Sequence, residues 1–171
     1  MLNEEQLFFR FKGKAVLLDS NLLLVFLTGS LGAQVFKRFK RISDYTLADY
    51  ELLVRFIDNF SVLLTTPHIL TEISNLANSL PNWYKPDWYE NLAGLIACNG
   101  DAVQVREEWV PAIELVKMPE FISYGITDSV VTKLSSEALV LTEDYRLSGA
   151  LRHKNVPVMN FRDLKSLQML N

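Results

Sequence analysis

A short apolar run that ends in an acid constrains the fold of this chain more than any other feature. Residues Ala15–Leu18 are all apolar, Asp19 follows directly, and the small polar pair Ser20 and Asn21 then leads into a second apolar stretch. Such a run, bounded by a turn signal, is typical of a buried strand of a parallel sheet. Open α/β sheets bind ligands at the carboxyl ends of their strands, where Asp19 would lie. Asp19 is therefore predicted either to cap a helix or to hold a cation.

Alternating strand and helix patterns predict an α/β fold of three layers, α/β/α, around a central, mostly parallel sheet. Further buried strands are predicted at residues 61–65, 138–142 and 156–159. Helices are predicted at residues 21–27, 46–60, 66–80 and 145 to about 154. Two further helices are predicted to begin at Thr127 and at Asn160. Threonines 46, 66 and 127 are the predicted N-caps of three of these helices. For the first fourteen residues the pattern fits either a short helix or an edge strand.

Composition narrows the class of protein. The chain has 171 residues, 49% of them hydrophobic and 22% charged, which fits one globular domain with a substantial core. No apolar run is long enough to span a membrane, and the N-terminus lacks the order of a signal peptide. The single cysteine, Cys98, is expected in the core of a cytoplasmic protein. A net charge of −3 excludes a global basic field for nucleic acid, but it does not exclude a local basic patch.

Residues 81–118 are the least regular part of the chain and are predicted to form a helical insert. A turn signal at residues 99–101 divides this segment into two predicted helices. The segment also concentrates aromatic side chains, namely Trp83, Tyr84, Trp88, Tyr89 and Trp109. Such a group can stack nucleic-acid bases, but packing between helices is the commoner use and the favoured interpretation.

A dense basic cluster follows the first predicted helix. Its charged members are Lys37, Arg38, Lys40 and Arg41. The favoured interpretation is an amphipathic helix that buries two phenylalanines, at positions 36 and 39, and exposes a solvated basic face. The alternative is a surface that contacts the phosphates of a nucleic acid beside an acidic site.

Four acids stand where predicted strands end or predicted helices begin: Asp19, Glu72, Asp128 and Asp144. Each alone has a structural explanation, such as a helix cap or an exposed helix residue. Together they point to one site, because Asp19 and Asp144 follow buried strands of the same type. Asn75 lies three residues after Glu72, on the same edge of its helix.

Gathering four carboxylates in one place requires a counter-charge. Two like charges about 4 Å apart repel by about 4 kcal/mol at an effective dielectric constant near ~20. A cation removes that cost, and carboxylate oxygens favour Mg²⁺ or Mn²⁺. Zinc is not expected, because His68 and His153 are isolated and no cysteine pattern accompanies them.

Short motifs around these acids give the chain a family resemblance. In order, they are Leu17-Leu18-Asp19-Ser20-Asn21, Thr66-Pro67-His68-Ile69-Leu70-Thr71-Glu72, Gly125-Ile126-Thr127-Asp128 and Leu141-Thr142-Glu143-Asp144. Their order and placement resemble a PIN-domain ribonuclease, over most of the chain from about residue 15 to about residue 164. The resemblance implies a single PIN-like domain over residues 1–171, with the insert at about 81–118.

The resemblance also implies an activity, the hydrolysis of RNA phosphodiester bonds with Mg²⁺ or Mn²⁺. By position, the four acids correspond to the catalytic and metal-binding residues of that family. Asn21 and Thr142 correspond to polar supporting residues, and Glu143 is an extra acid that can share the role of Asp144. Asp19 and Asp144 are the best candidates for direct metal ligands, while Glu72 and Asp128 would bind a second ion or order its waters.

The same resemblance implies candidate partners and leaves rival functions open. Toxin-type PIN ribonucleases are usually held by an antitoxin and often dimerise, so an antitoxin or other regulatory protein and a second copy of the chain are candidate partners besides RNA. The chain is longer than the compact toxins, which leaves a housekeeping or defence role equally open. One rival is a catalytically silent PIN-like module that acts through protein contacts. A more remote rival is a phosphatase of the haloacid dehalogenase type, which expects an aspartate where Asn21 stands.

Overall fold

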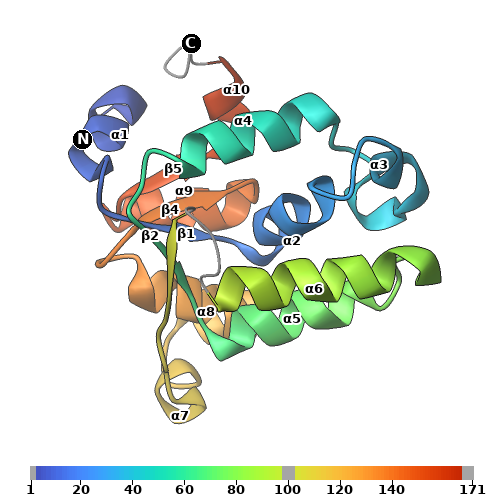
Figure 1. Cartoon of the computed structure of the whole chain (residues 1–171). Helices are drawn as coiled ribbons and strands as arrows, with labels where there is room; N and C mark the ends of the chain where they lie inside the picture. The colour runs from blue at the N-terminus through green and yellow to red at the C-terminus, as the bar shows by residue number, and fades with distance from the viewer. Residues whose placement is uncertain (1–2, 98–102, 167–171) are drawn as a thin grey trace.

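A parallel sheet of five strands forms the centre of the molecule (Figure 1). The computed structural model describes residues 3–97 and 103–166. The strands are β1 (Ala15–Leu18), β2 (Val62–Thr65), β3 (Gln104–Glu107), β4 (Leu139–Thr142) and β5 (Val158–Asn160). Their order across the sheet is β3-β2-β1-β4-β5, and every neighbouring pair is parallel. The predicted α/β class with a central parallel sheet is confirmed.

The first strand lies in the middle because it is apolar on both faces. All four residues of β1 are buried, and Val16 pairs with Leu63 of β2 on one side and with Leu139 of β4 on the other. A strand buried on both faces suits a parallel sheet covered by helices, since neither face has to meet water. The carboxyl ends of β1, β2 and β4 therefore meet along one edge, where Asp19, Thr66 and Glu143 follow them.

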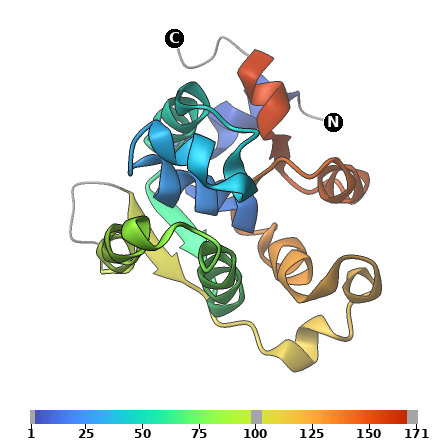
Figure 2. The same ribbon diagram turned by 90° about the vertical axis from the view of Figure 1, so that its right-hand side faces the viewer.

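Helices flank this sheet and alternate with its strands (Figures 1 and 2). Those that bear on the site are α2 (Ser20–Gly29), α4 (Leu47–Ile57), α5 (Pro67–Ala77), α8 (Glu120–Leu134) and α9 (Tyr145–His153). The remaining helical segments are α1 (Glu4–Phe11), α3 (Gln34–Arg38), η1 (Lys40–Ile42), η2 (Asn82–Tyr84), α6 (Lys85–Ile96), α7 (Ala112–Leu115) and α10 (Phe161–Ser166). The first fourteen residues thus supply a helix, and not an edge strand. Within the described residues, none of the helices is long and apolar enough to cross a membrane.

Several helix starts follow the predicted capping chemistry. The Thr46 hydroxyl accepts a hydrogen bond from the Asp49 N–H, and the Asp49 carboxylate accepts one from the Thr46 N–H, which forms a reciprocal cap on α4. The Thr66 hydroxyl caps α5, whose first residue is Pro67. The predicted cap at Thr127 is wrong, because the helical backbone of α8 is interrupted two residues earlier, at Gly125, and Thr127 lies inside the helix.

The predicted insert differs most from the structure. It contains α6, but its second half forms the edge strand β3 where a helix was predicted, and only the single turn of α7 follows. The sheet therefore has five strands where four were predicted. Polar residues explain the error, since Gln104, Arg106 and Glu107 in an exposed edge strand carry no buried apolar run. The predicted turn at residues 99–101 and the core position of Cys98 lie outside the described residues.

The three tryptophans of the insert differ in burial. Trp88 is fully buried and its indole N–H donates a hydrogen bond of 3.0 Å to the Thr28 hydroxyl, which ties α6 to α2. Trp83 is exposed, and so is Trp109. The prediction that these aromatics pack between helices is therefore confirmed for Trp88 and wrong for the other two tryptophans.

Candidate active site at the carboxyl edge of the sheet

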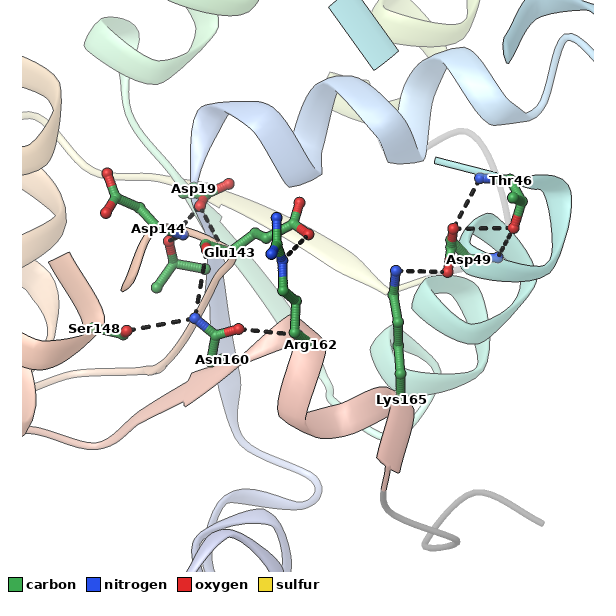
Figure 3. A network of polar contacts seen from close by, with 10 residues as sticks. Asp19, Thr46, Asp49, Glu143, Asp144, Ser148, Asn160, Arg162 and Lys165 are labelled. Carbon is green, nitrogen blue, oxygen red and sulfur yellow. Dashed lines mark hydrogen bonds and ion pairs between the residues drawn. The ribbon is translucent and has the colours of Figure 1, made fainter. Parts of the chain in front are cut away.

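Asp19 connects three elements of the fold at the end of β1. Its Oδ1 accepts a 2.8 Å hydrogen bond from the Leu22 N–H, so it is the N-cap of α2. Its Oδ2 accepts the Thr142 hydroxyl and, at 3.1 Å, the Glu143 N–H (Figure 3). The carboxylate is buried, which raises its pKa above the ordinary value, while the hydrogen bonds from Thr142, Leu22 and Glu143 act in the opposite direction. Asp19 is thus both a helix cap and a buried acid.

Asp144 is joined to Asp19 through Thr142. The Asp144 N–H donates a 3.0 Å hydrogen bond to the Thr142 hydroxyl oxygen, whose own proton goes to Asp19. The Asp144 Oδ1 caps α9 by accepting hydrogen bonds from the N–H groups of Arg146 and Leu147. Thr142 is completely buried, so this bridge is held firmly. Thr142 thus contacts both Asp19 and Asp144 through its hydroxyl group.

Glu72 reaches the same edge from α5. The hydroxyl of Ser20, the residue after Asp19, donates a 2.9 Å hydrogen bond to the Oε2 of Glu72. Helices α2 and α5 pack together, which brings the two side chains into contact. Ser20 was not among the predicted site residues, although its place directly after Asp19 is the signal that points to it. Asn75, one turn beyond Glu72, is exposed and lines a cavity together with it.

Asp128 provides the clearest sign that the four acids converge. Burial, and after it the charges of Asp144, Asp19 and Glu72, together raise its pKa from the ordinary 3.8 to about 6. The carboxylates of Asp19 and Asp144, at the N-caps of α2 and α9, and that of Glu72 on α5 therefore oppose the ionisation of Asp128. The carboxylate of Asp128 accepts no hydrogen bond from the described part of the chain that would offset this effect. Four acids far apart in the sequence share one electrostatic environment.

This environment predicts a pH-dependent gain in stability for the Asp128→Asn variant. The folded-state pKa of about 6 lies above the ordinary 3.8, so the ionised carboxylate destabilises the folded state. That destabilisation is complete above about pH 6 and disappears as the pH falls toward the unfolded-state value. After allowance for solvent screening at this partly exposed position, the metal-free variant is expected to be more stable than the parent by roughly 1 kcal/mol at pH 8.

Chemical denaturation of both proteins in a chelator, from pH 4 to pH 8, measures this difference. The gain is expected to be near zero at pH 4 and to grow with pH. An equal or lower stability of Asp128→Asn at pH 8 would show that the carboxylates do not repel one another in the folded protein.

Glu143 pairs its carboxylate with a basic residue, although its charge also helps to raise the pKa of Asp19. Its carboxylate forms a 2.8 Å ion pair with Arg162 (Figure 3). The hydroxyl of Tyr45 lies against the same carboxylate. Burial and this contact raise the pKa of Tyr45 far above its ordinary value, so the phenol stays protonated. Its backbone N–H contacts Asp19, whereas its side chain is occupied elsewhere. Glu143 thus contacts Asp19 through its backbone, while its carboxylate is paired with Arg162; a role shared with Asp144 stays a prediction.

One residue of the basic cluster reaches this edge of the sheet. The Arg41 guanidinium donates a 3.1 Å hydrogen bond to the side-chain oxygen of Asn21, at the start of α2. Arg38 lies over the ring of Trp83, with 5.9 Å between the guanidinium carbon and the ring centre. All four cations of the cluster are exposed, while Phe36 and Phe39 are buried as predicted. Arg41 thus holds a positive charge at the first turn of α2, beside a residue two positions after Asp19.

The donors present fit a hard cation held partly through water. All four acids offer oxygen, and the excess negative charge around Asp128 is what a cation would neutralise. Among the described residues, no three Asp, Glu, His or Cys side chains are close enough to bind one ion directly. Mg²⁺ needs only one or two direct carboxylates, because it retains several of its waters.

The chain was also compared with known proteins. The sheet order and its parallel strands are consistent with PIN-like and Rossmann-like folds. No family model matches the sequence, and no curated protein matches it.

Proposed function

We propose that this protein is a divalent-metal-dependent ribonuclease of the PIN-domain type, with Asp19, Glu72, Asp128 and Asp144 as its acidic residues. The observation that carries the proposal is geometric: the Thr142 hydroxyl joins Asp19 to Asp144, and the Ser20 hydroxyl brings Glu72 to the same edge of the sheet. The raised pKa of Asp128, to which the charges of these three acids contribute, agrees with it. Like charges gathered at the ligand-binding edge of a parallel sheet destabilise the fold unless a cation joins them. A site of that kind is suited to phosphodiester hydrolysis assisted by a metal ion.

The chain's own residues would divide the work as follows. Asp19 and Asp144 would hold the cation, with Thr142 fixing their relative position through its two hydrogen bonds. Glu72, oriented by the Ser20 hydroxyl, and Asp128 would order waters around it. A bound Mg²⁺ or Mn²⁺ would supply a nucleophile by acidifying water and would neutralise charge on the phosphate. Arg41 would contact a neighbouring phosphate of the RNA.

The direct test is cleavage of single-stranded RNA by the purified protein. We expect products with Mg²⁺ or Mn²⁺ and none after chelation, together with a rise in melting temperature on addition of the metal, because an ion bound only by the folded state stabilises it. Asp58→Asn is a matched control, since Asp58 is an exposed residue that precedes β2 at the opposite edge of the sheet. Absence of cleavage over a broad set of RNAs would contradict the proposal.

A second candidate is a non-catalytic module that acts through protein contacts. It is favoured by exposed apolar side chains around α7 and the start of α8, notably Ile113, Val116 and Ile122. It is also favoured by the lack, within the described ranges, of three acids placed to bind an ion directly. Metal binding without cleavage in the same assay would favour this module over the ribonuclease.

A further inference from the structure

A cavity of about 340 Å³ opens directly beside the acidic group. Its walls come from α5, from α8 and from the segment that follows β3. Glu72 and Asn75 line one side, Ile126 and Thr127 another, and Trp109 closes a third. The cavity therefore shares Glu72 with the candidate active site, and Thr127 is the sequence neighbour of Asp128. The cavity is thus open to a part of any ligand that is bound at Glu72.

Trp109 stands out among the residues around this cavity. Its side chain is 75% exposed and lines the cavity, so its indole ring is open to a ligand there. Its backbone is anchored on both sides, because the Glu108 N–H donates a 2.9 Å hydrogen bond to the Thr65 carbonyl and Val110 is buried. The indole is therefore presented at the carboxyl edge of the sheet by fixed neighbours.

The chemistry of the walls matches one kind of ligand. Trp109, Ile126 and Pro67 offer apolar faces, while Asn75 and Thr127 carry groups that can donate and accept hydrogen bonds. A nucleobase has the same two features, a flat aromatic face and a polar edge. Indole rings are among the groups on which unpaired bases stack, and this stacking tolerates any base. A base held in a duplex would not be free to enter.

On these grounds we infer that the cavity binds an unpaired base of an RNA strand, with Trp109 as its stacking platform, next to the phosphate that lies at the acids. This inference rests on the proposed ribonuclease function and adds a preference for single-stranded substrate. Trp109 acts in binding and takes no part in the chemistry of cleavage.

The test measures binding of a fluorescently labelled single-stranded RNA oligomer by anisotropy, with Mg²⁺ present. Asp19→Asn serves as the background, so that the oligomer stays intact. In that background Trp109→Ala is expected to weaken binding about tenfold, and Trp109→Phe is expected to retain most of it, because phenylalanine keeps an aromatic face. The same RNA annealed into a duplex is expected to bind at least about tenfold more weakly than the single strand. Ile122→Ala is the matched control, since Ile122 is 90% exposed on the neighbouring helix but does not line the cavity.

Two outcomes would overturn the inference while leaving the ribonuclease proposal in place. One is RNA cleavage by the parent protein combined with unchanged RNA binding in Trp109→Ala. The other is an equal loss in Trp109→Ala and Ile122→Ala, which would indicate a broad apolar surface for a protein partner. Failure of the proposed function itself would be seen separately, as absence of cleavage by the parent protein.

Discussion

Asp19→Asn is expected to lose at least about a hundredfold in metal-dependent RNA cleavage. Residues that only support metal ligands cost about 10- to 100-fold when they are changed, so loss of a ligand carboxylate should exceed that range. The position of Asp19 strengthens the expectation, because it is buried at the end of the central strand and is joined to Asp144 through Thr142. Cleavage rates at saturating Mg²⁺ measure the effect.

The fold of this variant should persist, which separates catalysis from stability. An asparagine at position 19 can still accept the Leu22 N–H and cap α2. Removing a buried charge whose pKa is raised favours the metal-free folded state. The amide nitrogen of asparagine would face the Glu143 N–H, and two donors facing each other lower the stability. Because the two effects oppose each other, we expect the metal-free variant to melt close to or above the melting temperature of the parent. Undiminished cleavage by Asp19→Asn would refute the assignment of the site.

Gly29→Ala is expected to destabilise the protein by about 2 kcal/mol or more. Gly29 ends α2 and is buried against α4. A methyl group there would lie 2.3 Å from Cδ2 and 2.9 Å from Cβ of Tyr50, so the whole side chain of Tyr50 would have to move. The overpacking should outweigh the gain of about 1 kcal/mol that alanine normally gives within a helix. Equilibrium denaturation measures the difference.

Gly94→Ala is the control for this prediction. Gly94 lies in α6, and a methyl group there would meet no atom within 4 Å, so only the helix preference of alanine remains. We expect Gly94→Ala to stabilise the protein by up to about 1 kcal/mol. In a double-mutant cycle, Tyr50→Ala should cancel the part of the Gly29→Ala penalty that comes from the ring, while the contact at 2.9 Å with the Cβ of residue 50 remains. A neutral Gly29→Ala would mean that α2 and α4 are packed less tightly than described.

The parts of this fold that were predictable carry strong local signals. β1 has an apolar run bounded by an acid, and α4 and α5 have cap residues at their first positions. β3 could not be predicted in this way, because an exposed edge strand needs few apolar residues and Val105 is its single apolar member. Its partner β2 determines its position, and that pairing is a long-range contact.

The candidate site shows the same limit. Acids at the ends of parallel strands were expected to meet, because the sheet topology brings those ends to one edge. Contacts that depend on side-chain direction were not predictable, such as the pairing of Glu143 with Arg162 and the reach of Arg41 to Asn21. The sequence places Trp109 in an aromatic group. Its exposed position follows from the edge strand β3 just before it, and the sequence pattern did not predict that strand.

The proposed function would give Asp19 and Asp144 a second role beside helix capping, and this has an evolutionary consequence. Each acid caps a helix, so a descendant that no longer cleaves RNA would still be under selection to keep a capping side chain at both positions. Asp128 has no capping role, because its carboxylate accepts no hydrogen bond from the described residues, and its charge is unfavourable without an ion. Among homologues, replacement of Asp128 should therefore mark inactive descendants sooner than replacement of Asp19.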